Sequence, residues 1–285
     1  MIQIAAIQMS SQDKIEQNLA DAYALLQQVA ALGSSLAVLP ENFACFAAGQ
    51  QQQTAAQFEL IAAQLAEWAC QLGLWIIAGS LPCPYRPNGQ MIPDGRVRSS
   101  CLLFDPSGQI VARYDKIHLF DVNVADGTGG YQESRHFEAG NQIVTAQTPF
   151  GMLGLMICYD LRFPELALAL RQHGAQILTA PSAFTYMTGQ QHWSLLLRAR
   201  AIDSQCWVIG ANQVGWHGTR QTWGNSSIID YMGQICAADH TGASTVITAC
   251  YDQTHLIAQR SAMPLMEHRR LDLPTTILTK DVRYG

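Results

Sequence analysis

The chain has 285 residues, of which 17 are Lys or Arg and 22 are Asp or Glu, so its formal net charge is −5. With 48% hydrophobic residues it has enough apolar side chains for a large core. Only 14% of the residues are charged and no basic cluster occurs, so we expect no nucleic-acid partner. The uncharged stretches 139–159 and 172–197 are interrupted by polar residues, Pro or Gly, and we expect no membrane-spanning helix. The N-terminal MIQIAAIQMS lacks the features of a signal peptide, which predicts a soluble, cytoplasmic protein.

Strand and helix patterns alternate through the first 80 residues. Short apolar runs at 2–9, 36–39 and 74–78 predict strands. Between them, apolar residues recur at helical spacing from Ile15 to Val29 and from Phe58 to Leu72, and Gly33 and Gly73 follow as stop signals. This βαβαβ order is typical of an α/β fold.

The rest of the chain continues the alternation after a hairpin and a long loop. Strands are predicted at 97–104 and 109–114, on either side of the turn 105–108. The glycine-rich segment 120–140 has no period and predicts a long, functional loop. Further strands are predicted at 152–158, 176–180, 206–211, 226–230 and 245–251, with helices at 164–173 and 190–205. No composition shift marks a linker, so we expect one domain over 1–285, with 271–285 as a C-terminal tail.

Cysteine and histidine spacing gives no support for a metal site. The eight cysteines lie too far apart for a CxxC pair, and the eight histidines show no HExxH pattern. We therefore expect no metal, no cofactor and no disulfide framework, with most cysteines buried as small apolar residues.

Cys158 is the exception, because it ends an apolar strand just before Pro164 opens a helix. A helix N-terminus favours a thiolate there, which would suit a nucleophile, although a buried core cysteine is the simpler interpretation. Glu41 and Lys116 each follow a predicted strand end and offer a base and an oxyanion donor. Taken singly, each is an ordinary solvated charge. A histidine base also stays open, with three candidates, His118, His136 and His192.

Taken together, the three segments resemble the carbon–nitrogen hydrolase (nitrilase-like) superfamily. The motifs are LPENF at 39–43, YDKIH at 114–118 and ICYDLRFPE at 157–165, and the resemblance extends from Ile4 to about Arg270. It implies a Glu41, Lys116, Cys158 triad, with Glu133 as a second glutamate that supports the lysine. It also implies an α/β fold, namely a four-layer αββα sandwich with two mixed sheets. A homodimer formed through one outer helical layer is expected on the same ground.

Further motifs look like the branch of deaminated-glutathione amidases. They are PSAF at 181–184, TG at 188–189, HW at 192–193, LRARAI at 197–202 and the C-terminal pattern at 263–270. The ω-amidases, which act on α-ketoglutaramate, share part of this set and stay the alternative. A non-catalytic binding protein would be expected to lack a triad member, and an N-acyltransferase to add membrane spans.

The resemblance implies amide hydrolysis through a thioester on Cys158. Lys116 and the backbone N–H of Tyr159 would hold the oxyanion. Arg162 would bind a substrate carboxylate bidentately, helped by Phe184 and Thr188. The expected substrate is deaminated glutathione, which would yield 2-oxoglutarate and Cys-Gly, and segments 120–140 and 216–223 are expected to line a channel for the leaving dipeptide.

Overall fold

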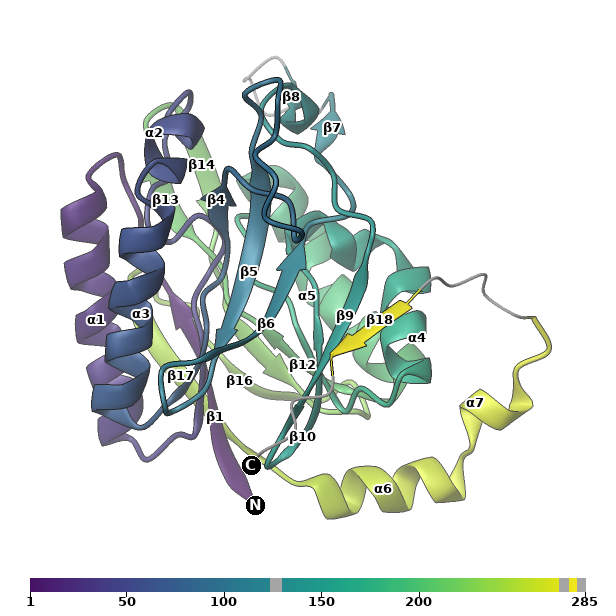
Figure 1. The fold of residues 1–285 in the computed structure, drawn as a ribbon. Coiled ribbons are helices and arrows are strands. Elements are labelled where there is room, and N and C mark those ends of the chain that lie inside the picture. The colour runs from purple at the N-terminus through teal and green to yellow at the C-terminus, as the bar shows by residue number, and fades with distance from the viewer. Residues whose placement is uncertain (124–129, 272–276, 281–285) are drawn as a thin grey trace.

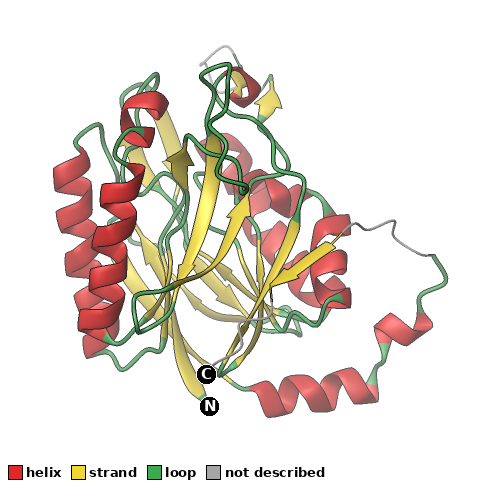
Figure 2. Ribbon diagram, viewed as in Figure 1, coloured by secondary structure: helices red, strands yellow, loops and turns green. Residues whose placement is uncertain are grey.

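The computed structural model describes residues 1–123, 130–271 and 277–280, and its core is two mixed β-sheets packed face to face (Figures 1 and 2). The first sheet has the order β17-β1-β2-β3-β5-β4, with β6 also pairing β5. Its strands are β17 (Thr245–Tyr251), β1 (Ile2–Gln8), β2 (Leu36–Val38), β3 (Trp75–Ile77), β5 (Arg98–Phe104), β4 (Leu81–Cys83) and β6 (Ile110–Asp115). Within it, β1, β2 and β3 are parallel, as the predicted βαβαβ order requires.

The second sheet has the order β16-β15-β12-β11-β10-β9-β18. Its strands are β16 (Ile235–Ala238), β15 (Ser227–Ile229), β12 (Trp207–Gly210), β11 (Ile177–Thr179), β10 (Gly151–Leu155), β9 (Ile143–Thr148) and β18 (Ile277–Lys280). The parallel strands are β10, β11 and β12 at its centre, and β18 alongside β9. The second half of the chain thus repeats the plan of the first.

Helices cover the outer face of each sheet. α1 (Ile15–Ala31) and α3 (Phe58–Leu72) pack on the first sheet through a core that includes Leu26, Leu65 and Ile7. α4 (Pro164–Gln172) and α5 (Tyr186–Ser204) cover the second sheet. A second core, which contains Ile4 and Leu153, fills the space between the sheets. The predicted four-layer αββα sandwich is therefore confirmed.

Several elements differ from the sequence prediction. The predicted loop 120–140 contains two short paired strands, β7 (Asp121–Val122) and β8 (Tyr131–Gln132), and a 3₁₀ turn, η1 (Glu133–Arg135). Residues 124–129 of that loop lie outside the described residues. α5 begins at Tyr186, four residues before the predicted start. The unpredicted elements include β4, β9, β16, β18, α2 (Gln51–Ala55), β13 (Val214–His217), β14 (Arg220–Trp223), α6 (Gln253–Ala262) and α7 (Leu265–His268).

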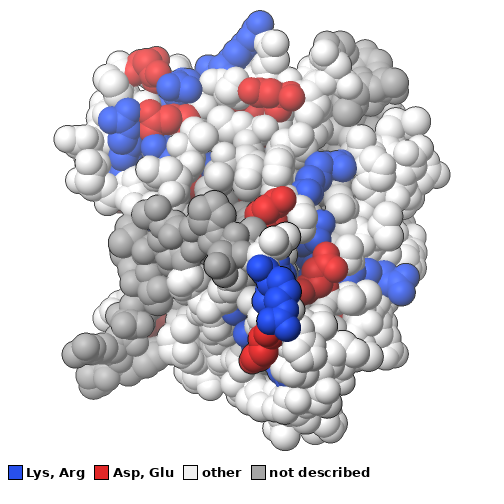
Figure 3. All heavy atoms as spheres, turned by 90° about the vertical axis from the view of Figure 1, so that its right-hand side faces the viewer, with Lys and Arg blue, Asp and Glu red and all other residues white. Residues whose placement is uncertain are grey.

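No helix in the described ranges combines the length and the apolar character needed to cross a bilayer. Seen from the right-hand side of Figure 1, the surface is mostly uncharged, and Lys and Arg side chains lie beside Asp and Glu (Figure 3). Among the described residues, this face therefore carries no extended patch of one sign.

Candidate active site

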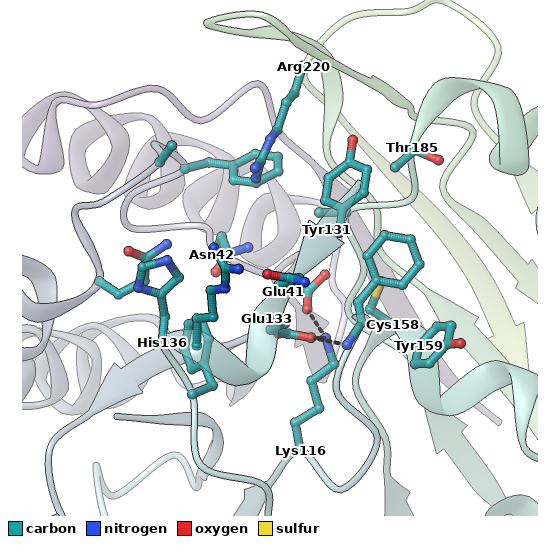
Figure 4. A pocket seen from close by; sticks show the side chains of 18 of the residues that line it. Glu41, Asn42, Lys116, Tyr131, Glu133, His136, Cys158, Tyr159, Thr185 and Arg220 are labelled. Carbon is teal, nitrogen blue, oxygen red and sulfur yellow. Dashed lines mark hydrogen bonds and ion pairs between the residues drawn. The ribbon is translucent and has the colours of Figure 1, made fainter. Parts of the chain in front are cut away.

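Three strand ends bring Glu41, Lys116 and Cys158 to one place (Figure 4). Glu41 and Lys116 are only 5% and 2% exposed, so the interpretation of each as a solvated loop charge is wrong. Lys116 Nζ donates to Glu41 Oε1 at 2.8 Å. It also donates to both carboxylate oxygens of Glu133, at 3.0 Å each. One ammonium thus lies between two carboxylates at the bottom of the site.

Burial and ion pairing act in opposite directions on this cluster. Burial disfavours the charged form of Lys116, but the carboxylates of Glu133 and Glu41 outweigh it and raise the pKa of Lys116 well above its ordinary value. Lys116 therefore remains an ammonium. Burial also raises the pKa of Glu133, and Glu41 adds to that effect, while Lys116 and the N–H of Phe120 oppose it.

Cys158 begins a short 3₁₀ helix, η2 (Cys158–Arg162), with a φ of 47°. A non-glycine residue is rarely found in this left-handed region, and such strain is typical of functional turns. Its N–H donates to Pro181 O at 2.8 Å, which ties the turn to the end of β11. Burial and the Glu41 carboxylate raise the pKa of the thiol well above its ordinary value, against the opposing effect of Lys116. Burial therefore favours the protonated thiol, which needs a base when it attacks.

The backbone around Glu41 is held by close packing. Gly79 has a φ of 45°, and a Cβ there would lie 1.9 Å from Pro40 O, so only glycine allows the two segments to approach. Gln213 Nε2 donates to Glu41 O at 2.9 Å from the far side. The carboxylate therefore projects from a fixed turn.

Asp160 is a site residue to which the sequence analysis assigned no role. It is fully buried and accepts hydrogen bonds from Tyr114 Oη, at 2.7 Å, and from the backbone N–H of Ile157 and of His118. His118 Nδ1 lies 2.7 Å from Asp160 Oδ1. Asp160 thus joins the strand that precedes Lys116 to the turn that carries Cys158. Its position inside the ICYDLRFPE motif was the only signal available.

A cavity of about 560 Å³ opens above the cluster. All the residues that were predicted to form the site line it, namely Glu41, Lys116, Glu133, Cys158, Tyr159, Arg162, Phe184 and Thr188. Residues of the segment 120–140 form one wall, as expected, whereas only Arg220 reaches the cavity from the segment 216–223. Asn42 and Gln50 were not predicted as site residues, whereas Tyr131, Arg135 and Arg220 belong to the two expected wall segments without having been singled out.

The predicted carboxylate-binding residues are already engaged with their neighbours. Arg162 Nη1 lies 3.2 Å from His192 Nδ1, and its guanidinium lies 5.3 Å from the centre of the Phe184 ring. The backbone N–H of Phe184 donates to Asn212 Oδ1 at 3.1 Å, so a substrate could use that group only by sharing it. Thr188 Oγ1 lies 2.8 Å from the hydroxyl of Thr185.

The candidate histidines are placed less favourably than Glu41. His118 is held by Asp160 and stacks on Phe163 at 3.7 Å, and His192 contacts Arg162; neither lines the cavity. His136 does line it, at its exposed rim. Within the described ranges, no three His, Cys, Asp or Glu side chains are grouped as a metal site requires.

A four-layer αββα sandwich with a Glu, Lys, Cys cluster at its strand ends defines a thiol-dependent class of amide hydrolases. The family model described as carbon–nitrogen hydrolase matches residues 3–260, so the chain belongs to that family. It is therefore a hydrolase that acts on carbon–nitrogen bonds of amides.

Relatives support this membership over nearly the whole chain. The chain is 40% identical to the deaminated glutathione amidase of Yersinia enterocolitica over 271 residues, 94% of this chain and 92% of that one. It is 38% identical to the human protein of that name over 277 residues, with shares of 95% and 83%.

Solved structures show the same fold. The C. elegans NitFhit protein has a TM-score of 0.86 and 34% identity, covering 94% of this chain; this chain spans only 65% of that one. Saccharomyces cerevisiae Nit3, a member of branch 10 of the nitrilase superfamily, has a TM-score of 0.81 at 26% identity, covering 95% of this chain and 97% of that one.

Proposed function

We propose that the chain hydrolyses the amide of deaminated glutathione, releasing 2-oxoglutarate and the dipeptide Cys-Gly. The observation that carries this proposal is the buried cluster of Glu41, Lys116 and Cys158 inside one cavity. The similarity to relatives named deaminated glutathione amidase supplies the substrate class.

Formation of the thioester begins with Glu41. Glu41 takes the proton of the Cys158 thiol as Sγ attacks the amide carbon. Because burial raises the pKa of this thiol, the attack needs a base within reach, and Glu41 lines the same cavity. Lys116 and the backbone N–H of Tyr159 hold the oxyanion, and each such donor is worth a few kcal/mol, about 3, in a dry site.

Breakdown of the tetrahedral intermediate uses the same carboxyl group. Glu41 returns its proton to the amide nitrogen, the C–N bond breaks, and Cys-Gly leaves as an amine. Water then attacks the thioester while Glu41 accepts its proton, which releases the acid and restores the thiol. Glu133 holds Lys116 in place through two hydrogen bonds during both steps.

Arg162 binds the α-keto carboxylate end of the substrate. Its guanidinium lies at the C-terminal end of η2, four residues after Cys158, and faces the cavity between the rings of Tyr159 and Phe184. Stacking orients the planar fork for a bidentate contact. The same contact would hold α-ketoglutaramate, and this favours the ω-amidase reaction as the second candidate.

The test is a comparison of kcat/KM for deaminated glutathione and α-ketoglutaramate with purified enzyme, scored by release of Cys-Gly or ammonia. We expect the larger amide to be the better substrate, because contacts to the leaving dipeptide strengthen transition-state binding. Cys158→Ala should abolish both reactions, whereas Cys206→Ala, a change at a buried core thiol, should retain them. A preference for α-ketoglutaramate would make the enzyme an ω-amidase.

We also propose that the chain is a cytoplasmic homodimer that pairs through α5. α5 and the adjacent turn expose Met187, Leu195, Ile202 and Met232, an apolar set that a second copy would cover. All eight cysteines are free, which suits a reducing compartment.

A further inference from the structure

We propose that Arg220 binds the carboxylate at the leaving-group end of the substrate, the glycine carboxylate of Cys-Gly. This inference rests on the proposed function and names the residue that distinguishes the dipeptide amide from a small ω-amide. The β13–β14 hairpin is then a specificity element, separate from the groups that act on the scissile bond.

The described charges that line the cavity favour a substrate with two negative groups. Among the described residues, its charged lining consists of two carboxylates, Glu41 and Glu133, and four cations, Lys116, Arg135, Arg162 and Arg220. Lys116 is bonded to both carboxylates, so positive charge is in excess at the arginines. Deaminated glutathione carries two carboxylates, whereas α-ketoglutaramate carries one. With one carboxylate on Arg162, a second cation is available for the other.

Arg220 is the better placed of the two remaining arginines. It is half-buried, whereas Arg135 is exposed. Its guanidinium lies 4.8 Å from the centre of the Tyr131 ring, and this stacking orients the planar group while leaving its edge donors available. No carboxylate within the described part of the chain forms an ion pair with it.

The hairpin that carries Arg220 is firmly anchored. In its register His217 pairs with Arg220. The buried His217 ring contacts Ser11 O at 2.6 Å through Nδ1 and Thr222 Oγ1 at 2.8 Å through Nε2. At the other end of β14, the Trp223 N–H donates to Phe184 O at 2.9 Å. Arg220 therefore projects from a fixed support and not from a free loop, which lowers the entropic cost of binding.

The position of Arg220 also suits the length of the leaving group. In Figure 4, Arg220 and Lys116 enter the site from opposite sides, with Glu41 and Cys158 between them in that view. From the scissile nitrogen, the dipeptide places its carboxylate up to about 7 Å away, the span of two extended residues. A cavity of about 560 Å³ has room for this arm beside the keto-acid half.

The test compares Arg220→Gln with the wild-type enzyme on three substrates: deaminated glutathione, its glycinamide analogue and α-ketoglutaramate. We expect the ratio of kcat/KM for deaminated glutathione to that for α-ketoglutaramate to fall about 10- to 100-fold, mostly through KM, because a bidentate charge-assisted contact is lost. The ratio for Arg220→Lys should lie between those of wild type and Arg220→Gln, since an ammonium keeps the charge attraction but cannot make the bidentate contact of a guanidinium. Arg135→Gln is the matched control and should shift the ratio less than about threefold, since exposed charge contacts are weak.

The glycinamide analogue makes the test specific for the carboxylate. Wild-type enzyme should prefer the free acid to the amide, and Arg220→Gln should lose that preference. An unchanged substrate ratio in Arg220→Gln, or a larger change in Arg135→Gln, would overturn the assignment, as would a wild-type enzyme indifferent to amidation. Failure of wild-type enzyme to cleave deaminated glutathione would instead reject the proposed function.

Discussion

At the scale of single residues, Glu41 is the group that distinguishes a carboxylate base from a histidine base. Glu41→Gln is nearly isosteric and can still accept the hydrogen bond from Lys116, but it cannot take a proton from the thiol. We therefore expect kcat to fall about 10²-fold or more. His118→Asn should lower kcat less, because His118 contacts Asp160 and Phe163 and lies outside the cavity lining. Steady-state kinetics of both variants would decide, and an active Glu41→Gln beside an inactive His118→Asn would support a Cys–His mechanism.

The sequence predicted that Glu41, Lys116 and Cys158 lie in one site because short motifs carry them. Glu41, Lys116 and Cys158 each lie just past a strand end, and their motifs are local enough to be recognised. Arg220 belongs to the segment 216–223, which was expected to line the leaving-group channel, but no motif singled it out, because only the folded chain brings this hairpin over Tyr131. Contacts of this kind depend on tertiary structure, so spacing along the chain gives no signal for them.

At the scale of elements, the prediction succeeded where one face of a helix is strictly apolar. α3 matches its predicted bounds because buried residues recur at helical spacing from Phe58 to Ala69 and Gly73 ends the helix in the left-handed conformation. The start of α5 was missed because Thr188 and Gly189 are poor helix formers. In the structure, a Cβ at Gly189 would meet Trp223 Cβ at 2.3 Å, so packing against β14 explains the glycine inside the helix. Two-residue strands such as β7 and β8 are too short to show any period.

Glu138 fastens the segment that follows Glu133 to the first sheet. It accepts hydrogen bonds from Arg86, at 2.7 Å, and from Arg98 at the start of β5. The hydrogen bond from Arg86, with further help from Arg98, lowers the pKa of Glu138 from 4.5 to about 2. The contacts of the Glu138 carboxylate with Arg86 and Arg98 therefore stabilise the fold fully above pH 4.5. This contribution to stability is lost as the pH falls towards 2.

We expect Glu138→Gln to lower the free energy of unfolding by about 1 to 3 kcal/mol at pH 7. The difference in free energy of unfolding between wild type and Glu138→Gln should narrow by about 0.5 to 1 kcal/mol when the pH is lowered to 4. At this pH the wild-type carboxylate begins to protonate in the unfolded state only. Urea unfolding at the two pH values measures both quantities. Glu59→Gln, at an exposed position of α3, is the control, and a gap that did not change with pH would contradict this account.

At the scale of the whole molecule, the distribution of charge separates the surface from the site. The chain carries a net charge of −5, whereas cations outnumber carboxylates among the described residues that line the cavity. Attraction of an anionic substrate is therefore confined to short range, inside the cavity, where burial limits screening by salt. One core cluster, which runs from Ile4 to Leu256, includes side chains of both sheets, and this continuity supports the prediction of a single domain.

The proposed dimer can be tested on the exposed face of α5. Leu195 and Ile202 lie two helical turns apart and therefore share a face, and Arg198 between them donates to Gly233 O at 2.8 Å, which places the Met232 turn beside them. Leu195 is 66% exposed in one chain, so a carboxylate there costs little in a monomer but would be buried without a partner in the dimer. Light scattering at micromolar concentration should give twice the chain mass of 31.3 kDa for wild type and a monomer for Leu195→Glu. Leu60→Glu, on the outer face of α3 and 72% exposed, should remain dimeric. A monomeric wild type would contradict the proposed dimer. Dissociation by Leu60→Glu and not by Leu195→Glu would place the dimer contact on α3 instead of α5.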